Sequence, residues 1–289
     1  MPDDGRDGFS TIVLGRRGAG AWLTLNRPHA LNATNETMHA ELLRAVAEVA
    51  ADPQVKALVI TGAGDKAFCI GSDLEFLDEA FGSGDFRLFR AYLERLNQIF
   101  FALEELPIPT IALVNGKARA GGFELMLACD LAIVAEEALI GDVHTPYGHM
   151  PGGGATQRAA RRIGLQKALE LIYTGRWLTG SEAVESGLAL RAVPRAALRS
   201  EGEALVERLA MATRESLGFI KRAAYAGWDL PLREGVALEI ECYLEYLETC
   251  AAPVEIYFAN QRRQRRTSQD AVMPGRAVPP TRAEPGPAA

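Results

Sequence analysis

One acidic residue, Glu124, stands among apolar neighbours in a place where a carboxylate could transfer protons. The residues from Phe123 to Ala128 are otherwise apolar, so a helix there has no polar stripe to face water and is expected to be buried. Burial of a carboxylate is costly unless the group is paired or used, and it raises the pKa toward the range useful for proton transfer. The alternative is an acid on a solvated helix; the apolar neighbours favour the functional role.

Two glycine turns could supply backbone donors for an anion. Gly121 and Gly122 lie where a turn should lead into a helix, and Gly71 holds the same kind of position before Ser72 and Asp73. Glycine permits unusual backbone angles and the close approach of a ligand. The first turn of a helix offers free N–H groups and a partial positive charge, so it can hold an anion without a basic side chain. An ordinary strand-to-helix turn is the alternative at Ser72, and the second glycine turn weighs against it.

The segment around Glu124 is expected to form a strand, a turn, a short helix and a second strand. Thr110–Val114 and Leu131–Ala135 are short apolar runs typical of buried strands, and they flank the turn and the helix. Other strands, the first two joined across a glycine-rich hairpin at Gly15–Gly20, are expected at Ser10–Leu14, Ala21–Leu25, Ala57–Thr61, Leu139–Gly141 and Leu188–Val193. A helix capped by Thr34 or Asn35 is expected to have an apolar face made by Met38, Leu42, Val46 and Val49. A glycine-containing loop is expected at Phe81–Asp85, followed by a long helix marked by apolar residues from Phe86 to Leu103. Further helices are expected at Gln166–Tyr173 and at Glu182–Ser186, the latter capped by Ser181.

From Ala196 the periodicity becomes wholly helical, which predicts a boundary near residue 195. Helices are expected over 196–212, 214–226, 232–249 and 253–264. The last 23 positions, 267–289, are rich in Pro, Ala, Gly and Arg and are expected to be disordered. The predicted organisation is therefore an α/β part over 1–195, a helical region over 196–266 and a tail over 267–289.

Composition narrows the class of protein. The chain has 289 residues, 48% of them hydrophobic and 24% charged, as in globular proteins. The net charge of −6 and the lack of a basic stripe disfavour nucleic-acid binding. No apolar run reaches about 20 residues and no signal peptide is expected, so a membrane span is not predicted. The cysteines lack paired spacing, which indicates reduced core thiols in a cytoplasmic protein and neither disulfides nor a metal site: Cys69, Cys129, Cys242 and Cys250.

Several long motifs, in order and at matching spacing over roughly residues 10–264, resemble the enoyl-CoA hydratase/isomerase (crotonase) superfamily. A set of motifs in register is far more specific than any one of them. The matching stretches are Leu25–Pro28 with Ala30–Ala33, Ala67–Leu74, Asn115–Gly116 with Ala120–Leu125 and Ala128–Asp130, Pro151–Arg158, Thr174–Arg176, and Ala183–Leu188.

The resemblance implies a fold that periodicity alone does not indicate. Periodicity favours a doubly wound α/β sheet. The resemblance implies a spiral of ββα turns followed by helices, assembled as trimers or pairs of trimers. In the helical region, a broad apolar surface is consistent with a homo-trimer interface made by Cys242, Tyr243, Leu244, Tyr246 and Leu247.

The resemblance also implies an acyl-CoA thioester as ligand, with CoA as part of the substrate and no separate cofactor. By motif position, the thioester carbonyl lies between the N–H groups of Ser72 and Gly121, which agrees with the anion site expected from the glycine turns. Such an oxyanion hole stabilises a thioester enolate. The residues that border the CoA arm by the same resemblance are His29, Ala30, Leu31, Asp73 and Leu74; an ordinary helix start is the alternative for the first three.

One position departs from the family pattern. Hydratases of this superfamily use two glutamates: the first matches Glu124, and the second matches His144. A neutral imidazole can act as acid or base near pH 7, and Asp142 is close enough in sequence to orient it. The alternative is a loop histidine bonded to backbone. His149 is expected to be structural, and His29 and His39 are expected in a loop and on a helix surface.

The leading functional interpretation is a 2-enoyl-CoA hydratase-type lyase of fatty acid metabolism in which Glu124 and His144 share proton transfer. Superfamily hydrolases of carbon–carbon bonds in diketones resemble this chain at His144, but they carry an acid in the segment that here reads Gly152–Gly154. The same acid-free segment weighs against a dehalogenase. An isomerase that uses one glutamate and a non-catalytic crotonase-fold scaffold complete the alternatives.

Overall fold

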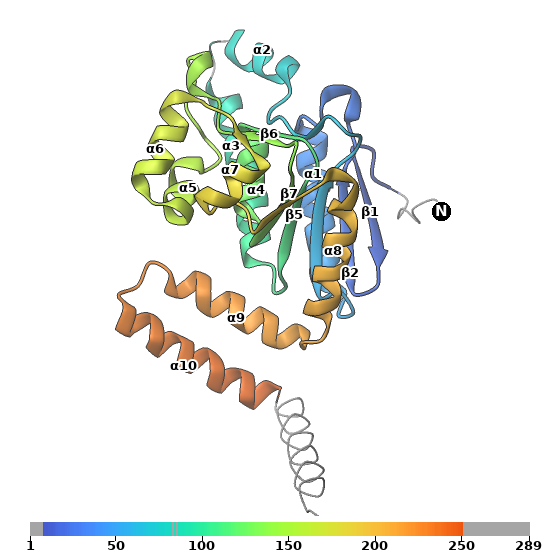
Figure 1. The fold of residues 1–289 in the computed structure, drawn as a ribbon, viewed down its shortest axis with the longest axis vertical. Helices are drawn as coiled ribbons and strands as arrows, with labels where there is room; N and C mark the ends of the chain where they lie inside the picture. The colour runs from blue at the N-terminus through green and yellow to red at the C-terminus, as the bar shows by residue number, and fades with distance from the viewer. Residues whose placement is uncertain (1–7, 83, 85, 251–289) are drawn as a thin grey trace, which may run out of the picture. The chain divides into compact units, whose positions relative to one another are not determined.

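In a computed structural model of the chain (Figure 1), residues 8–82, 84 and 86–250 are described. The chain divides into two compact units, Met1–Tyr243 and Leu244–Ala289, and of the second unit only residues 244–250 are described. The predicted helix over 253–264 and the predicted tail over 267–289 therefore lie outside the described residues.

The first unit contains two sheets. The larger has the order β1-β2-β3-β5-β7-β10, and all its neighbours are parallel except the β1–β2 hairpin. The smaller has the order β4-β6-β8-β9. The strands are β1 Ile12–Arg17, β2 Gly20–Leu25, β3 Ala57–Gly62, β4 Ala67–Cys69, β5 Thr110–Val114, β6 Lys117–Arg119, β7 Leu131–Ala135, β8 Leu139–Gly141, β9 Leu178–Thr179 and β10 Arg191–Val193.

The two sheets are built by a spiral. From β3 to β8, strands that follow each other in the chain go to different sheets, so β3, β5 and β7 stack in one while β4, β6 and β8 stack in the other. Helices close each turn of the spiral. This is the crotonase-like α/β fold that the resemblance implies, rather than the doubly wound sheet that periodicity alone favours.

The helices are α1 Glu36–Ala51, α2 Leu74–Gly82, α3 Phe86–Glu105, α4 Gly121–Ala128, α5 Ala155–Ile163, α6 Leu165–Thr174, α7 Gly180–Ser186, α8 Arg195–Ala210, α9 Arg214–Gly227 and α10 Leu232–Thr249, with short 3-10 turns at Pro28–Ala30 and Thr145–Tyr147. None of the helices in the described part is long and apolar enough to cross a membrane.

Helix α4 lies in the middle of the main core, as its apolar sequence predicts. Every residue from Gly122 to Ala128 is buried, Glu124 included. The core around α4 also takes in the apolar faces of α1 and α3. A second cluster, in which α8 packs on the opposite face of the larger sheet, contains Trp22, Val59, Leu113, Leu205 and Val206. The core therefore holds α4 from all sides, which fixes the residues at its first turn.

Several predicted boundaries are wrong by a few residues. The first hairpin turns at 18–19 rather than across Gly15–Gly20, because Gly15 pairs with Trp22 within the ladder. Thr179, not Ser181, caps α7, where it forms a capping box with Glu182. Strand β10 begins at Arg191 rather than at Leu188. Residues Phe81 and Gly82, predicted as loop, end helix α2.

Helix α9 is attached to the core by a buried lysine. The ammonium of Lys221 lies 2.8 Å from the Asp130 carboxylate and donates to the carbonyls of Leu103 and Ile108 at 2.7 and 3.2 Å. The Tyr225 hydroxyl donates to the other oxygen of Asp130 at 2.7 Å. Burial lowers the pKa of Lys221, and the charge of Asp130 opposes that shift. These contacts fix α9 against the end of α3.

Candidate active site

The two predicted anion-binding turns meet in the structure. A Cβ placed on Gly121 would lie 3.1 Å from Cα of Gly71 and 3.9 Å from the amide nitrogen of Ser72. A Cβ placed on Gly71 would lie 2.8 Å from the amide nitrogen of Gly121. Such separations leave no room for a side chain, so glycine is required on both sides. The fold thus brings together Ser72 and Gly121, which come from successive turns of the spiral.

Both amides are free to donate. Thr34 is hydrogen-bonded to the two residues on either side of Ser72. The Thr34 N–H donates to the Gly71 carbonyl at 2.8 Å, and the Asp73 N–H donates to the Thr34 carbonyl at 2.9 Å. Ser72 lies between these two bonds, so its own N–H faces away from Thr34. Gly121 is the first residue of α4 and has no earlier turn to bond with. Within the part of the chain that the structure describes, neither N–H has a protein acceptor.

An unusual backbone conformation aims the Gly121 amide. Ala120, the residue before α4, has φ 49° and ψ −118°, which non-glycine residues seldom adopt. Its N–H donates to the carbonyls of Gly141 and Asp142 at 3.3 and 3.0 Å, and these bonds hold the strained peptide in place. The following Gly122 lies so near the Cys69 carbonyl that no Cβ could fit. The strain is therefore located at Ala120, the residue directly before the donor.

Glu124 is held by the segment that precedes α5. It is 1% exposed, and its Oε1 accepts from the N–H groups of Gly153 and Ala155 at 2.7 and 3.2 Å. A Cβ on Gly153 would approach Oε2 of Glu124 to 2.5 Å. Asn97 and Arg158 fix the same segment, since their side chains donate to the carbonyls of Gly152 and Gly153 at 2.9 and 2.8 Å. The predicted burial of Glu124 is confirmed, and its carboxylate lies at the start of a helix.

His144 forms a pair with Asp142. The imidazole Nδ1 lies 2.9 Å from Oδ1 of Asp142, and the side chains are 19% and 0% exposed. Because an ionised carboxylate can only accept, Nδ1 carries the proton and Nε2 is left as an acceptor. The residue between them, Val143, has φ 53°, a left-handed conformation that brings the two side chains to the same side. The expectation that Asp142 orients His144 is confirmed.

The pKa values of Glu124 and His144 are both raised by their surroundings. Burial raises the pKa of Glu124 to about 7, while the charge of His144 and the N–H groups of Ala155 and Gly153 oppose the rise. Burial alone would lower the pKa of His144, but the hydrogen bond and charge of Asp142, together with Glu124, raise it. The charge of each group shifts the pKa of the other, so Glu124 and His144 titrate as a pair.

The loop predicted to border the CoA arm lies beside the Ser72 turn. His29 and Ala30 form part of a 3-10 turn, and Leu31 follows with φ 52°. An ion pair of 2.7 Å between Arg27 and Asp73 joins the loop to the start of α2. Leu74 is 67% exposed there. The fold therefore brings the five predicted residues into one region; their contact with a ligand stays a prediction. A cavity of about 340 Å³ next to it is lined by Arg27, Asn35, Asp73, Phe76 and Leu88 among others.

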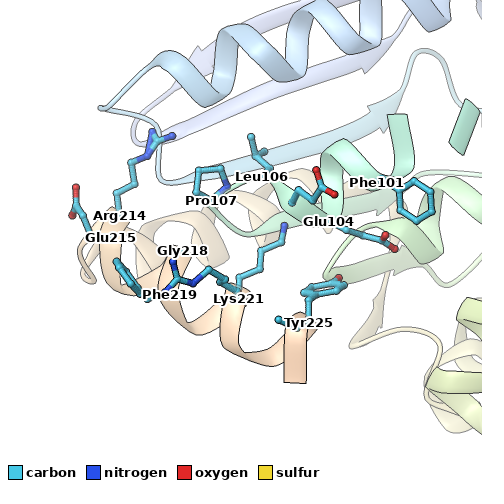
Figure 2. Close-up of a pocket in the computed structure, with 13 residues that line it drawn as sticks. Phe101, Glu104, Leu106, Pro107, Arg214, Glu215, Gly218, Phe219, Lys221 and Tyr225 are labelled. Carbon is cyan, nitrogen blue, oxygen red and sulfur yellow. The ribbon is translucent and has the colours of Figure 1, made fainter. Parts of the chain in front are cut away.

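A larger cavity lies elsewhere. It has a volume of about 640 Å³ and lies between the end of α3 and α9, where Figure 2 shows Lys221 and Tyr225 facing Glu104 and Leu106. None of the predicted catalytic, oxyanion or substrate-binding residues lines it. Its size alone is no reason to assign it chemistry, because the groups around it make the structural contacts that attach α9.

Sequence reasoning missed or misplaced several residues. His39, expected on a helix surface, is fully buried, and burial lowers its pKa to about 4. The amides of Gly153 and Ala155 were not expected to hold Glu124; the glycine run before α5 was the available signal. No group of three or more metal-ligating side chains occurs in the described residues, and all four cysteines have free thiols.

Comparison with known proteins agrees with the fold. The profile of the enoyl-CoA hydratase/isomerase family matches residues 16–258. A probable mitochondrial enoyl-CoA hydratase of Dictyostelium discoideum is 36% identical over 231 residues, 80% of this chain and 81% of that protein. A short-chain-enoyl-CoA hydratase of Clostridium acetobutylicum is 31% identical over 83% of this chain and 91% of its own.

A solved structure of the same kind extends the comparison to three dimensions. The crystal structure of an enoyl-CoA hydratase from Bacillus anthracis superposes with a TM-score of 0.82 at 31% identity, and covers 88% of this chain and 97% of its own. The protein is thus a crotonase-fold enzyme. Its chain belongs to the enoyl-CoA hydratase/isomerase family.

Proposed function

We propose that this enzyme is a 2-enoyl-CoA hydratase-type lyase, in which Glu124 and the Asp142–His144 pair add water to an acyl-CoA thioester. The single observation that carries the proposal is the placement of a wholly buried carboxylate, with its pKa raised to about 7, three residues after a free helix-terminal amide. Chemistry alpha or beta to a thioester carbonyl needs both: a donor for the oxygen and a proton-transfer group for the carbon.

The proposed reaction assigns one role to each group. The thioester oxygen lies between the N–H groups of Ser72 and Gly121, which stabilise the enolate by about 3 kcal/mol each. Nε2 of His144 takes a proton from water as the water oxygen bonds to the beta carbon. Glu124, protonated, gives its proton to the alpha carbon. The site is restored when His144 releases its proton and Glu124 regains one, so the net change is one water added across the double bond.

The first experiment is turnover of crotonyl-CoA, with the product identified by mass and by the position of its double bond. We expect a 3-hydroxyacyl thioester, and a loss on the order of 100-fold or more in the Glu124→Gln variant. Glu185→Gln, an exposed carboxylate on α7, is the matched control and should behave like the native enzyme. An unhydrated product with a moved double bond would instead identify an isomerase, and binding without turnover would identify a scaffold.

A second candidate rests on the Asp142–His144 contact. Carbon–carbon bond hydrolases of this superfamily pair such a histidine with an acid, and Asp142 here supplies one from the opposite side in sequence. In that reaction His144 would activate water to attack a ketone carbon, and the bond to the neighbouring carbon would break as an enolate. Cleavage of a cyclic 1,3-diketone, with crotonyl-CoA left unchanged, would favour this candidate over hydration.

The proposal includes a homo-trimer or a hexamer in the cytoplasm. Exposed apolar side chains continue along α9 and α10, where Ile220 is 67%, Leu232 is 82% and Tyr243 is 56% exposed. Cys242, predicted to belong to this surface, is instead buried. Light scattering at micromolar concentration should give three or six times the 31.2 kDa chain mass; a monomer would contradict the proposal.

A further inference from the structure

A buried tyrosine lies directly behind the Ser72 turn. The hydroxyl of Tyr92, on α3, is hydrogen-bonded to Oγ1 of Thr34 at 2.8 Å and donates to the Thr34 carbonyl at 3.4 Å. Both residues are almost completely buried, at 2% and 4% exposed. A buried hydroxyl that finds its partners in this way fixes the backbone to which they belong.

Thr34 transmits this constraint to the oxyanion turn. Its N–H and carbonyl bond to Gly71 and Asp73, the two neighbours of Ser72, so that the peptide carrying the Ser72 N–H is held on both sides. Tyr92 contacts Thr34 at the same carbonyl that receives the Asp73 N–H. One hydrogen-bonded path therefore runs from the α3 phenol to the backbone on either side of the proposed donor.

The ring of Tyr92 is also fixed by its neighbours. It stacks on Phe76 of α2 at 4.2 Å between centroids and 23° between planes, and His39 of α1 packs against it at 4.6 Å. Neither ring nitrogen of His39 has a hydrogen-bond partner among the described residues. Since its pKa is lowered to about 4, the imidazole is neutral in this apolar contact. Three helices thus fix the position of the Tyr92 hydroxyl.

We propose that Tyr92 is a positioning residue for the reaction: acting through Thr34, its hydroxyl holds the Ser72 N–H in line with the thioester oxygen. The inference rests on the proposed function, because it assumes that an acyl-CoA carbonyl occupies the site. Small misplacements of a preorganised donor reduce its effect on the transition state steeply, more than its effect on substrate binding. Burial raises the pKa of Tyr92 to about 12, so the phenol remains a donor throughout the working pH range.

The test removes the hydroxyl and keeps the ring. Tyr92→Phe preserves the stack on Phe76, and Thr34→Val removes one side-chain partner of the hydroxyl and leaves the other, Ser72. We expect each variant to lose on the order of 10-fold in kcat with KM changed less than about twofold, and the double variant to lose little more than either. The pH profile should keep its limbs, because neither residue transfers a proton. Tyr173→Phe, an exposed phenol on α6, is the control.

A spectroscopic measurement separates positioning from loss of structure. In the native enzyme, the infrared C=O stretch of a bound, unreactive acyl-CoA should lie at lower frequency than in water. In Tyr92→Phe, that frequency should rise part of the way toward its value in water. An unchanged kcat, or an unchanged carbonyl stretch despite slower turnover, would overturn the inference. A native enzyme that shows no carbonyl shift with any acyl-CoA would overturn the proposed function itself, and a native shift that Tyr92→Phe leaves intact would overturn only the role of Tyr92.

Discussion

Nδ1 of His144 lies 2.9 Å from Oδ1 of Asp142, a carboxylate that is itself wholly buried. The other oxygen of Asp142 is also buried and has no hydrogen-bond partner within the described part of the chain. A buried carboxylate in that situation depends on the imidazole for compensation of its charge. The contact therefore selects one tautomer of His144 and favours its protonated form.

Asp142→Asn should lower the pKa of His144, because it removes both the charge and the strongest acceptor that favour the imidazolium. It should also lower the pKa of Glu124, which the charge of Asp142 raises. Both limbs of the pH–rate profile are then expected to move to lower pH, with turnover reduced by about 10-fold or more. A profile that keeps its native limbs would show that Asp142 has no influence on the reacting pair.

His144→Gln keeps size and hydrogen bonding but removes proton transfer. We expect a loss on the order of 100-fold in kcat with little change in KM, and the loss of one limb of a bell-shaped pH profile. His149→Gln is the matched control. His144→Glu should restore part of any hydratase activity. If Glu124→Gln is inactive while His144→Gln is not, the histidine is structural and a one-carboxylate reaction is indicated.

The raised pKa of Glu124 predicts how stability depends on pH. Between the ordinary pKa of 4.5 and the folded value of about 7, the folded protein binds a proton that the unfolded chain has released. Stability contributed by protonated Glu124 is therefore lost as pH rises through this window. Glu124→Gln keeps an acceptor for the two N–H groups and removes the titration. In denaturant titrations, the unfolding free energy of Glu124→Gln minus that of the native protein should increase by on the order of 2 kcal/mol between pH 5 and pH 8.

Gly121→Pro removes one donor of the proposed oxyanion hole and should reduce turnover by about 100-fold or more. Proline is tolerated at the first position of a helix, and Gly121 holds that position in α4. The added ring would also crowd Gly71, so circular dichroism is measured first to identify whether the variant has kept its fold. Near-native turnover by such a folded variant would exclude the Gly121 amide as a donor.

Lys221→Met should destabilise the attachment of α9 by about 3 kcal/mol, since it leaves the half-buried Asp130 without its cation. Thermal unfolding monitored alongside crotonyl-CoA turnover would check this, with Lys167→Met on α6 as the control. Loss of turnover at temperatures where the variant remains folded would show that α9 influences the site directly.

The site could be predicted where it depends on local pattern. A helix that is apolar from Phe123 to Ala128 except for Glu124 has no polar face for solvent, so its burial is predictable. Gly71 and Gly121 mark turns in which a side chain would not fit. The contacts of Glu124 with Gly153 and Ala155 could not be predicted, because they join segments whose approach depends on how α5 packs. Strand β6 is too short, at three residues, to produce a periodic signal.

His39 shows the limit of periodicity more clearly. Histidine is a polar residue, so it is expected on the outside of a helix that has an obvious apolar face. In the structure its ring fills the space against Tyr92 instead, and neutrality makes that burial possible. The contact with Tyr92 of α3 completes that burial.

The meeting of Gly71 and Gly121 has a consequence for folding kinetics. The two proposed donors belong to different coils of the spiral, so neither coil contains a working site alone, and the contact between them closes a long loop of chain. In a refolding experiment, far-ultraviolet ellipticity should recover first. Turnover should recover later, at the rate at which neighbouring coils of the spiral dock. The recovery of turnover would therefore report the rate of the last long-range step in folding.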